Sequence, residues 1–553
     1  MSLAQRIISP LAIVSLALLV ACGNNGAPNP NKNGYTVSDL NGTYVFSFSG
    51  TDVNFSTSTE SFFAITGTIT ADGKGNITGG TVDINDANLG GAGVFTAQAV
   101  SANPYTINTD GTGTLKLATP QGTFIANFVL TSDSHGLIMR FDNGGSGSGT
   151  LDMQGTATQG SLTSLAFTML GTEFNSDLGV NPVGTVGAFT LNGSGAITSG
   201  LEDFNDTGSS AGISDLALSG NVVLTSSTAG TATLNTSFAA MTFDVWVVDS
   251  THLKFIETDT TSGLALAGDA FPQQASFPAG QLVFAVAGGD TGIQFPLAAG
   301  GYVTTDANGN LGSGLEDYND GGVTNTVSPF TGTCNATAPF AGDRCQLTLT
   351  AFTNGFSTNL TFAAYPSAAG VLLLEDDSSG SFLQGAAYSQ LATAFGTPEA
   401  YGFNLTGFND DPQAGADGKV DQIGEFNATT SPNNLTGVVN ENDVGAAQVG
   451  SSLSGTFAPD SPATGRGSMT LTTPRTFLGG LSLEYYVINS STSLLIEGDA
   501  DQVTTGVFEL QSSPGTLVSK SLKASGGSSG ASSIVSLTRT FSKSHMAEKR
   551  RNK

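Results

Sequence analysis

The sequence predicts an all-β protein built from four tandem antiparallel domains. Glycine accounts for 73 of the 553 residues, charged residues for only 11%, and short apolar segments alternate with small polar residues. A period of two places alternate side chains on opposite faces of a strand. After residue 25 no segment has the length and period of a helix. Because the chain is 39% hydrophobic with 34 phenylalanines, it can fill the several cores that its length requires.

The N-terminus carries the features of an export signal. An apolar run from Ile7 to Val20 follows Arg6 and is shorter than the roughly 20 residues of a membrane-spanning helix. The sequence Leu18-Leu19-Val20-Ala21-Cys22-Gly23 resembles the lipobox of bacterial lipoproteins. This resemblance implies that residues 1–21 are a cleaved signal peptide and that Cys22 carries lipid. The alternative is an ordinary buried thiol at the end of an uncleaved helix.

The same resemblance implies a location. A lipid anchor makes the membrane a partner of this chain and places it in the cell envelope. Gly23 follows the cysteine where inner-membrane members of the family often have Asp, which favours the outer membrane, facing either the periplasm or the surface. Residues 22–38 are rich in Asn, Gly and Pro and are expected to form a flexible tether.

Self-comparison shows one unit repeated four times. The clearest element is Gly67–Asp86, with variants at Gly187–Asp206, Gly300–Asp320 and Gly424–Asp443. Each unit ends with a glutamine: Gln154, Gln273, Gln390 and Gln511. We therefore expect domains at residues 39–156, 157–276, 277–394 and 395–511, followed by a disordered basic tail at 512–553.

Each unit is expected to fold as a small up-and-down barrel or a sandwich. Seven or eight short strands can be counted in each, with Asn-Gly or Asp-Gly at tight hairpins such as Asp72-Gly73 and Asn192-Gly193. A sheet of this size with one apolar face must close on itself or stack. The length and hairpin order are similar to those of lipocalin- or avidin-like barrels at the level of architecture, and no motif of either family is matched.

Two cysteines remain after Cys22. Cys334 and Cys345 lie close together in the third unit, and an exported protein meets an oxidising compartment in which a disulfide persists. We therefore expect them to be bonded to each other. A metal site is the alternative, although it would need more ligands than the nearby sequence offers.

A polar element, Asp/Asn-x-Asn-Asp, recurs at the end of one strand in every unit. Its first and third residues share a face of the strand. Asn and Asp at a strand end bond to their own backbone and nucleate turns, which is the preferred interpretation. The alternative is Ca²⁺, which takes six to eight oxygen ligands; no other cofactor is expected. The calcium candidates are Asp83, Asn85, Asp86, Asp203, Asn205, Asp206, Asp317, Asn319, Asp320, Asn440, Asn442 and Asp443.

A second acidic element follows the penultimate strand of three units. It is Glu257/Asp259, Glu375/Asp377 and Glu497/Asp499, with Arg140/Asp142 in the first unit. Such a pair resembles the acid and base of a glycoside hydrolase, but we expect solvated strand ends. His135 and His252 occupy equivalent turns and do not recur in the other units. The sequence therefore predicts no catalytic residue.

The distribution of charge limits the classes of molecule that the chain is expected to bind. Residues 23–511 contain 9 Lys or Arg against 44 Asp or Glu. Phosphate contacts by Lys and Arg supply most nucleic-acid affinity, so we expect no nucleic acid partner. The predicted function is that of a lipid-anchored surface protein that binds a glycan or a protein, or has a structural role. The alternative is a carbohydrate-active hydrolase that uses Asp or Glu in one repeat.

Overall fold

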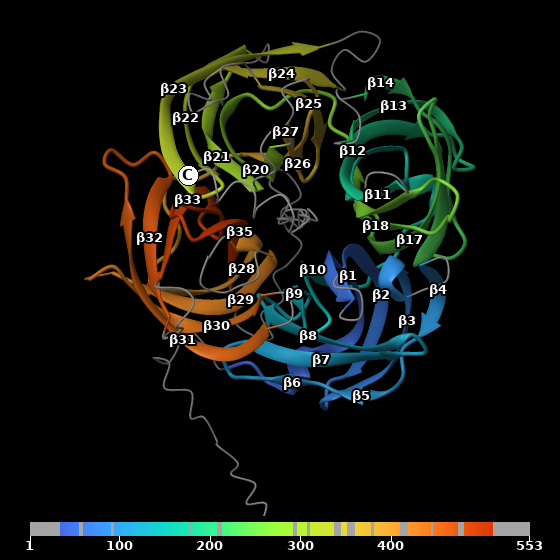
Figure 1. The fold of residues 1–553 in the computed structure, drawn as a ribbon, viewed down its shortest axis with the longest axis horizontal. Coiled ribbons are helices and arrows are strands. Elements are labelled where there is room, and N and C mark those ends of the chain that lie inside the picture. Colours follow the sequence, from blue (N-terminus) through green and yellow to red (C-terminus); the bar gives the residue numbers. More distant parts are fainter. Residues whose placement is uncertain are drawn as a thin grey trace, which may run out of the picture.

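The fold comes from a computed structural model that describes residues 34–512. Not described within this range are residues 55–58, 90–92, 176–178, 207–212, 291–295, 307–309, 337–343, 351–359, 378–380, 410–417, 431, 444–445 and 474–479. Cys22, the expected signal peptide, most of the tether and nearly all of the basic tail lie outside it. Figure 1 shows four β domains arranged in chain order around a common centre. The prediction of an all-β chain of tandem antiparallel domains is confirmed.

The first two repeats form sheets of ten and nine strands. Strands of the first are β1 (Asn41–Asn54), β2 (Thr59–Asp72), β3 (Asn76–Asp86), β4 (Val94–Ala99), β5 (Asn103–Pro104), β6 (Thr106–Ile107), β7 (Thr112–Thr119), β8 (Gly122–Leu130), β9 (His135–Asp142) and β10 (Gly145–Met153). Strands of the second are β11 (Ser164–Asn175), β12 (Gly179–Leu191), β13 (Ile197–Asp206), β14 (Ile213–Ala217), β15 (Ser219–Leu224), β16 (Ala229–Asn235), β17 (Ala240–Asp249), β18 (His252–Glu257) and β19 (Leu264–Pro272).

The last two repeats form closed eight-stranded barrels. Strands of the third are β20 (Gly280–Asp290), β21 (Pro296–Thr305), β22 (Asn310–Asp320), β23 (Val323–Ala336), β24 (Cys345–Thr350), β25 (Leu360–Ser367), β26 (Gly370–Glu375) and β27 (Ser381–Ser389). Strands of the fourth are β28 (Glu399–Asn409), β29 (Gly418–Thr429), β30 (Asn434–Asp443), β31 (Ala446–Pro459), β32 (Arg466–Thr472), β33 (Leu481–Asn489), β34 (Thr492–Glu497) and β35 (Gln502–Leu510).

Short 3₁₀ turns occur at Val37–Asp39, Ala87–Leu89 and Gln159–Ser161. In the described part of the chain, no helix has the length and apolarity needed to cross a membrane.

The fourth strand of each unit decides whether its barrel closes. In the third repeat the first part of β23 pairs with β22 and its last part pairs with β24. In the second repeat this strand is divided into β14, which pairs with β13, and β15, which pairs with β16. In the first repeat the fourth strand is divided near Pro104, because proline has no N–H to donate to a neighbouring strand. The count of seven or eight strands therefore fits the last two repeats and is too low for the first two.

Alternate residues of the strands fill the interior of each unit. Phe46 and Phe48 of β1 are 0% and 1% exposed and belong to the core of the first repeat. Phe167 and Phe403 take the place of Phe46 in the second and fourth repeats. Burying one such side chain contributes about 1.5–3 kcal/mol. The intervening residues face outward, towards solvent or towards the next repeat.

The predicted hairpins are formed between the second and third strands. Gly73 and Gly195 have φ of 67° and 89°, which a glycine adopts without a Cβ clash. The Asp72 carboxylate accepts hydrogen bonds from the amides of Lys74 and Asn76, at 2.7 and 2.9 Å. In the second repeat the Asn192 side chain accepts in the same way from Ser194 and Ala196, both at 3.0 Å.

Cys334 and Cys345 are bonded to each other and join β23 to β24, with their Cα atoms 5.5 Å apart. Replacing both by Ser should lower the free energy of unfolding of the third repeat by about 2–3 kcal/mol, because the cross-link restricts the unfolded chain. Chemical denaturation of oxidised wild type and the double variant measures this. Reduced wild type is the control and should match the variant. Equal stabilities of all three would contradict the expectation.

Candidate functional site

The third residue of the repeated polar element connects each repeat to the next. Its side-chain amide donates hydrogen bonds to backbone carbonyls at the end of the penultimate strand, or at the start of the last strand, of the following repeat. The bonds are Asn85 to Glu257 (3.0 Å), Asn205 to Glu375 and Ser381 (3.0 and 3.3 Å), Asn319 to Glu497, Asp499 and Gln502 (3.2, 2.8 and 2.8 Å), and Asn442 to Arg140, Asp142 and Gly145 (3.0, 3.2 and 2.7 Å).

The last of these bonds closes the ring. Asn442 belongs to the fourth repeat, and its three acceptors belong to the first, some 300 residues earlier. A head-to-tail interface that returns to its starting unit generates a closed ring. The four repeats therefore form one ring with the same type of junction used four times (Figure 1).

The terminal glutamines make a second contact at the junctions. The Gln511 side chain donates to the carbonyls of Asp110 and Leu130 in the first repeat, at 2.8 and 2.9 Å. The Gln390 side chain donates to Thr464 and Val487 in the fourth repeat, at 3.2 and 2.9 Å. Gln154 reaches Thr228 and Val247 of the second repeat, at the longer distance of 3.4 Å.

The first residue of the polar element accepts hydrogen bonds across three junctions, from a tryptophan at the first and from an arginine and a tyrosine at the second and third. Asp83 accepts from the Trp246 indole at 2.7 Å. Asp203 accepts from Arg344 at 2.9 and 2.7 Å and from the Tyr365 hydroxyl. Asp317 accepts from Arg466 at 2.6 and 2.9 Å and from the Tyr486 hydroxyl. In each case the donor belongs to the following repeat.

Three of these first residues also cap a bulge in their own sheet. The side chains of Asp83, Asp203 and Asn440 accept from the backbone amides of Ala97, Asp215 and Gly450, at 2.7, 2.8 and 2.7 Å. Those three residues have φ of 52°, 57° and 63°. At Ala97 and Asp215 the side-chain acceptor compensates for part of the cost of a left-handed backbone, whereas Gly450 adopts this conformation without strain.

Apolar side chains fill the rest of the junctions. Phe62 and Ala64 of the first repeat pack on Ile256 of the second, and Ile423 of the fourth packs with Val129 of the first. A cluster with Leu170, Val283 and Tyr486 joins repeats two to four. At the third junction a Cβ on Gly300 would lie 1.8 Å from Ile496 Cδ1, so the Ile496 side chain packs directly on the Gly300 backbone.

The turn interpretation of the polar element is incomplete. Asp86 does accept from the Asn88 amide at 2.8 Å, and Asn319 from Gly322 at 3.0 Å, as turn residues do. The inward-facing Asp320 is 8% exposed, and Asp443 accepts from the Asn409 side chain at 3.1 Å. The side chain of Asp206 is outside the described residues. Among the residues described, no three or more His, Cys, Asp or Glu are grouped so as to hold a metal.

The interpretation of the second acidic element as solvated strand ends is wrong for its glutamates, whereas Asp259, Asp377 and Asp499 are partly exposed. Glu257, Glu375 and Glu497 are 0%, 0% and 1% exposed, because they follow the inward-facing residues of their strands into the barrel interior. Arg140 replaces them in the first repeat and lies over the Phe63 and Phe124 rings, at 4.5 and 5.1 Å. A polysaccharide cannot reach carboxylates in these positions.

The second acid of each pair organises the adjacent loop. Asp259, Asp377 and Asp499 accept from the backbone amides of Thr242, Thr361 and Ser482, at 2.8, 2.5 and 2.7 Å. Asp142 accepts from the Ile125 amide at 3.2 Å in the first repeat. This role repeats in all four units, which explains why the residue type does.

Burial changes the protonation of the inward-facing acids. Desolvation raises the pKa of Glu257 and Glu497 well above the ordinary value, and the neighbouring Asp259 and Asp499 add to the effect. Burial likewise raises the pKa of Asp52 to about 8, helped by the nearby Asp86 and opposed by Arg140. Burial therefore favours the protonated, uncharged form of these groups.

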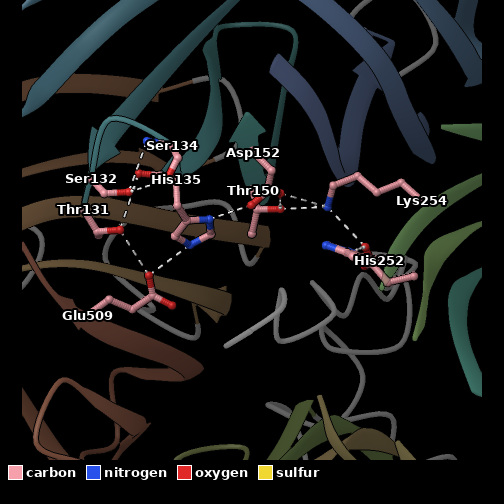
Figure 2. A network of polar contacts seen from close by, with 10 residues as sticks. Thr131, Ser132, Ser134, His135, Thr150, Asp152, His252, Lys254 and Glu509 are labelled. Atoms are coloured by element: carbon pink, nitrogen blue, oxygen red, sulfur yellow. Dashed lines mark hydrogen bonds and ion pairs between the residues drawn. The ribbon is translucent and has the colours of Figure 1, made fainter. Parts of the chain in front are cut away.

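One polar network is unique to the junctions that involve the first repeat (Figure 2). His135 lies between Asp152 and Glu509 of the fourth repeat, with Nδ1 at 2.6 Å from Asp152 and Nε2 at 3.0 Å from Glu509. Lys254 of the second repeat is 0% exposed and contacts Thr150 at 2.7 Å and Asp269 at 3.1 Å. His252 bonds Asp269 at 2.7 Å.

Attraction between basic and acidic side chains stabilises the network. Burial disfavours the protonated form of His135, but Glu509 and Asp152 outweigh burial and raise the pKa of His135 well above its ordinary value. Burial likewise opposes the charge of Lys254, while Asp269 and Asp152 together raise its pKa. Burial would raise the pKa of Asp152, but His135 and Lys254 lower it. The two junctions of the first repeat therefore place His135 and Lys254 among the carboxyl groups of Asp152, Asp269 and Glu509.

This geometry does not suit catalysis by His135. A histidine that activates a hydroxyl needs one free ring nitrogen to accept a proton. Both nitrogens of His135 face carboxylates, and only 23% of its side chain is exposed. The nearby Thr131 hydroxyl instead approaches Glu509, at 3.4 Å. The network therefore stabilises the ring.

Sequence reasoning missed this network because its members belong to three repeats. His135 and His252 were identified as equivalent turn residues, but no pattern pairs them with Lys254 or Glu509. Lys254 occupies the position of Leu137, Leu372 and Leu494 in the other repeats, as the shared strand register shows. The one sign of the network in the sequence was Lys254, a lysine at a position where the other three repeats have leucine.

No known protein family and no curated protein matches the sequence. Among solved structures, transferrin-binding protein B from serogroup B Neisseria meningitidis is 9% identical, with a TM-score of 0.19, over 68% of this chain and 83% of that one. A Trp-176-Ala mutant of transferrin-binding protein B from Haemophilus parasuis is 8% identical, with a TM-score of 0.20, over 88% and 99% of the two chains. Superposition at this level carries no argument about function.

Asn442→Ala should weaken the closing junction, because three backbone carbonyls lose their donor. We expect the free energy of unfolding to fall by about 1–3 kcal/mol, as for buried groups left without partners. Asn85→Ala is the matched control, since Asn85 makes one such bond. Chemical denaturation of both variants tests this. A loss for Asn85→Ala as large as that for Asn442→Ala would contradict the expectation.

His135→Gln should destabilise the ring most at acidic pH. Because the folded pKa is raised, the charged histidine contributes fully below its unfolded pKa of about 6.5, and this contribution is lost as pH rises towards the folded value. Unfolding of wild type and variant between pH 5.5 and 8.5 should show a difference that shrinks with rising pH. A difference that stays constant across the range would refute the ion-pair role.

Proposed function

We propose that this chain is a lipid-anchored protein of the outer membrane that uses its ring of four β domains as a platform for binding. The proposed anchor is Cys22 in the sequence Leu19-Val20-Ala21-Cys22, and residues 23–38 form the tether. The observation that carries the platform is the junction that recurs four times and closes through Asn442.

A closed cyclic arrangement orients the loops. When the same head-to-tail junction repeats around a ring, equivalent loops of all units lie on the same rim. The hairpins at Asp72–Asn76 and Asn192–Ala196 are therefore displayed on one side. Four similar surfaces on one rigid body suit multivalent binding, in which linked weak contacts raise the overall affinity.

The exposed charge favours a neutral ligand. Of the Lys and Arg residues that the structure describes, Arg140, Lys254, Arg344 and Lys419 are buried, and Arg466 is 14% exposed in ion pairs. Only Lys74 and Lys116 in this part of the chain are exposed. A surface so poor in cations repels nucleic acids and anionic polysaccharides. The ligand that we propose is a neutral glycan, and a protein is the alternative.

The anchor is tested by Cys22→Ser. The variant should remain unprocessed and unlipidated, because only the thiol of this residue accepts the lipid in the lipobox family. Metabolic labelling with a fatty acid, followed by membrane fractionation, measures this. Cys334→Ser is the matched control and should leave labelling intact. Unchanged labelling of the Cys22 variant would overturn the anchor.

Binding is tested on a glycan array with the chain from residue 23 to residue 512, which keeps every described residue. Multivalent recognition predicts retention on densely printed neutral glycans and much weaker retention on sparse ones, because avidity requires simultaneous contacts. Binding that does not depend on density would point to a single site. No retention at either density would refute the glycan assignment.

A further inference from the structure

The two rims of the ring are formed by opposite ends of the barrels. The terminal glutamines Gln154, Gln390 and Gln511 contact the next repeat at the barrel end where the first strand of a unit begins. The asparagine bonds of the junctions lie at the other end. We name the side with the glutamines the glutamine rim. The Asn192–Ala196 hairpin belongs to it, because the strand before this hairpin ends beside the start of β11.

Both ends of the described chain lie at one place on the glutamine rim. The Tyr35 hydroxyl donates to the Ser512 carbonyl at 3.0 Å. Ser512 directly follows Gln511, and its amide donates to the carbonyl of Thr131 in the first repeat at 2.8 Å. Tyr35 is 1% exposed, and its amide donates to the Thr109 carbonyl at 3.0 Å. The tether and residues 513–553 therefore leave the ring from neighbouring points.

Residues 513–553 carry a charge opposite in sign to that of the ring. They contain 8 Lys or Arg and 1 Glu, whereas residues 23–511 contain 9 Lys or Arg and 44 Asp or Glu. Four of the basic residues lie close together: Lys549, Arg550, Arg551 and Lys553. Clusters of basic residues beside a membrane anchor are typical of segments that bind anionic lipid. Because an acidic ring is repelled by such a surface, the attraction must come from residues 513–553.

We propose that residues 513–553 bind the phosphate groups of an anionic membrane, and that the glutamine rim faces this membrane. The orientation rests on the proposed anchor at Cys22. At roughly 3.5 Å per residue, the chain from Cys22 to Gly34 extends at most about 40 Å and that from Ser512 to Lys549 at most about 130 Å. The basic cluster is therefore able to reach any membrane that holds the tether. The opposite rim faces away from this membrane, and its four equivalent sets of loops retain the multivalent platform.

Vesicle sedimentation tests the lipid contact. The chain from residue 23 to residue 553 is used, so that the result does not depend on the anchor. The probes are vesicles of phosphatidylcholine, alone or mixed with phosphatidylglycerol. We expect at least tenfold tighter binding to the anionic vesicles at low salt, and loss of this difference in about 0.5 M NaCl, because salt screens exposed charges. Equal binding to both kinds of vesicle, or binding to neither, would overturn the proposal.

Variants assign the contact to the basic cluster. The combined variant Lys549→Gln, Arg550→Gln, Arg551→Gln and Lys553→Gln should weaken binding to anionic vesicles at least tenfold. The control Lys549→Arg, Arg550→Lys, Arg551→Lys and Lys553→Arg keeps the charge and should bind as wild type does. Binding that survives removal of residues 513–553 would refute the assignment.

A peptide of residues 513–553 separates the lipid surface from other acidic partners. Its affinity is measured for anionic vesicles, for the chain from residue 23 to residue 512 and for polyuridylate RNA. We expect the vesicles to bind it most tightly. Tighter binding to the chain would assign the peptide to the acidic ring, and tighter binding to RNA would assign it to nucleic acid; either result would overturn the proposal.

Labelled cysteines test the orientation in the lipidated full chain. Ser194 lies on the glutamine rim and Thr261 on the opposite rim of the same repeat, and both are exposed. Cys334 and Cys345 are bonded to each other and do not take the label. A fluorophore on Ser194→Cys should be quenched at least twofold more by nitroxide-labelled lipid headgroups than one on Thr261→Cys. Equal or reversed quenching would overturn the orientation. Absence of the lipid from Cys22 would overturn the anchor together with the orientation, whereas the sedimentation result would stand.

Discussion

A buried side-chain amide that donates to backbone carbonyls across each junction is the interaction on which the ring depends. Asn85, Asn205, Asn319 and Asn442 are equivalent, and each spans two repeats. The acceptors are main-chain groups, so the residues that supply them are free to change: three are glutamates and the fourth is Arg140. A neutral amide is also cheaper to bury than a charge. This combination explains why asparagine is retained at a position where its neighbours differ.

The first residue of the same element changes together with its partners, because those partners are side chains and not main-chain groups. Asp203 and Asp317 face an arginine and a tyrosine, and Asp83 faces a tryptophan. In the fourth repeat the residue is Asn440, and the first-repeat residue in the place of Trp246, Tyr365 and Tyr486 is Val129. A carboxylate buried against a valine would lack a donor. The change from Asp to Asn therefore matches the change of the partner.

The sequence was sufficient to predict the repeats, the strands and which residues share a face. These follow from local periodicity, which a single chain displays directly. It was not sufficient to predict what lies opposite an outward face, because a period of two does not distinguish water from another domain. Asn205 was interpreted as a turn residue and Glu375 as a solvated strand end for this reason. The closure between Asn442 and Arg140 joins residues some 300 positions apart, and no local pattern encodes it. The small cavity in the third barrel is lined by Val286 and Ala387, and only the strand register shows that the larger Phe48 and Leu151 occupy these positions in the first repeat.

Four similar units with a head-to-tail junction can assemble in more than one way. Without closure the same contacts would join separate molecules into open chains. The charged groups make the first and fourth junctions differ from each other and from the second and third. Lys254 with Asp152 marks the first, Arg344 with Asp203 the second, Arg466 with Asp317 the third and His135 with Glu509 the fourth. A mismatched pairing would bury a charge without its partner, and the loss of one partner of a buried pair costs about 3–5 kcal/mol. The amides thus make every junction possible, and the charges distinguish the two junctions of the first repeat from the second and third junctions, which share the same Asp, Arg and Tyr.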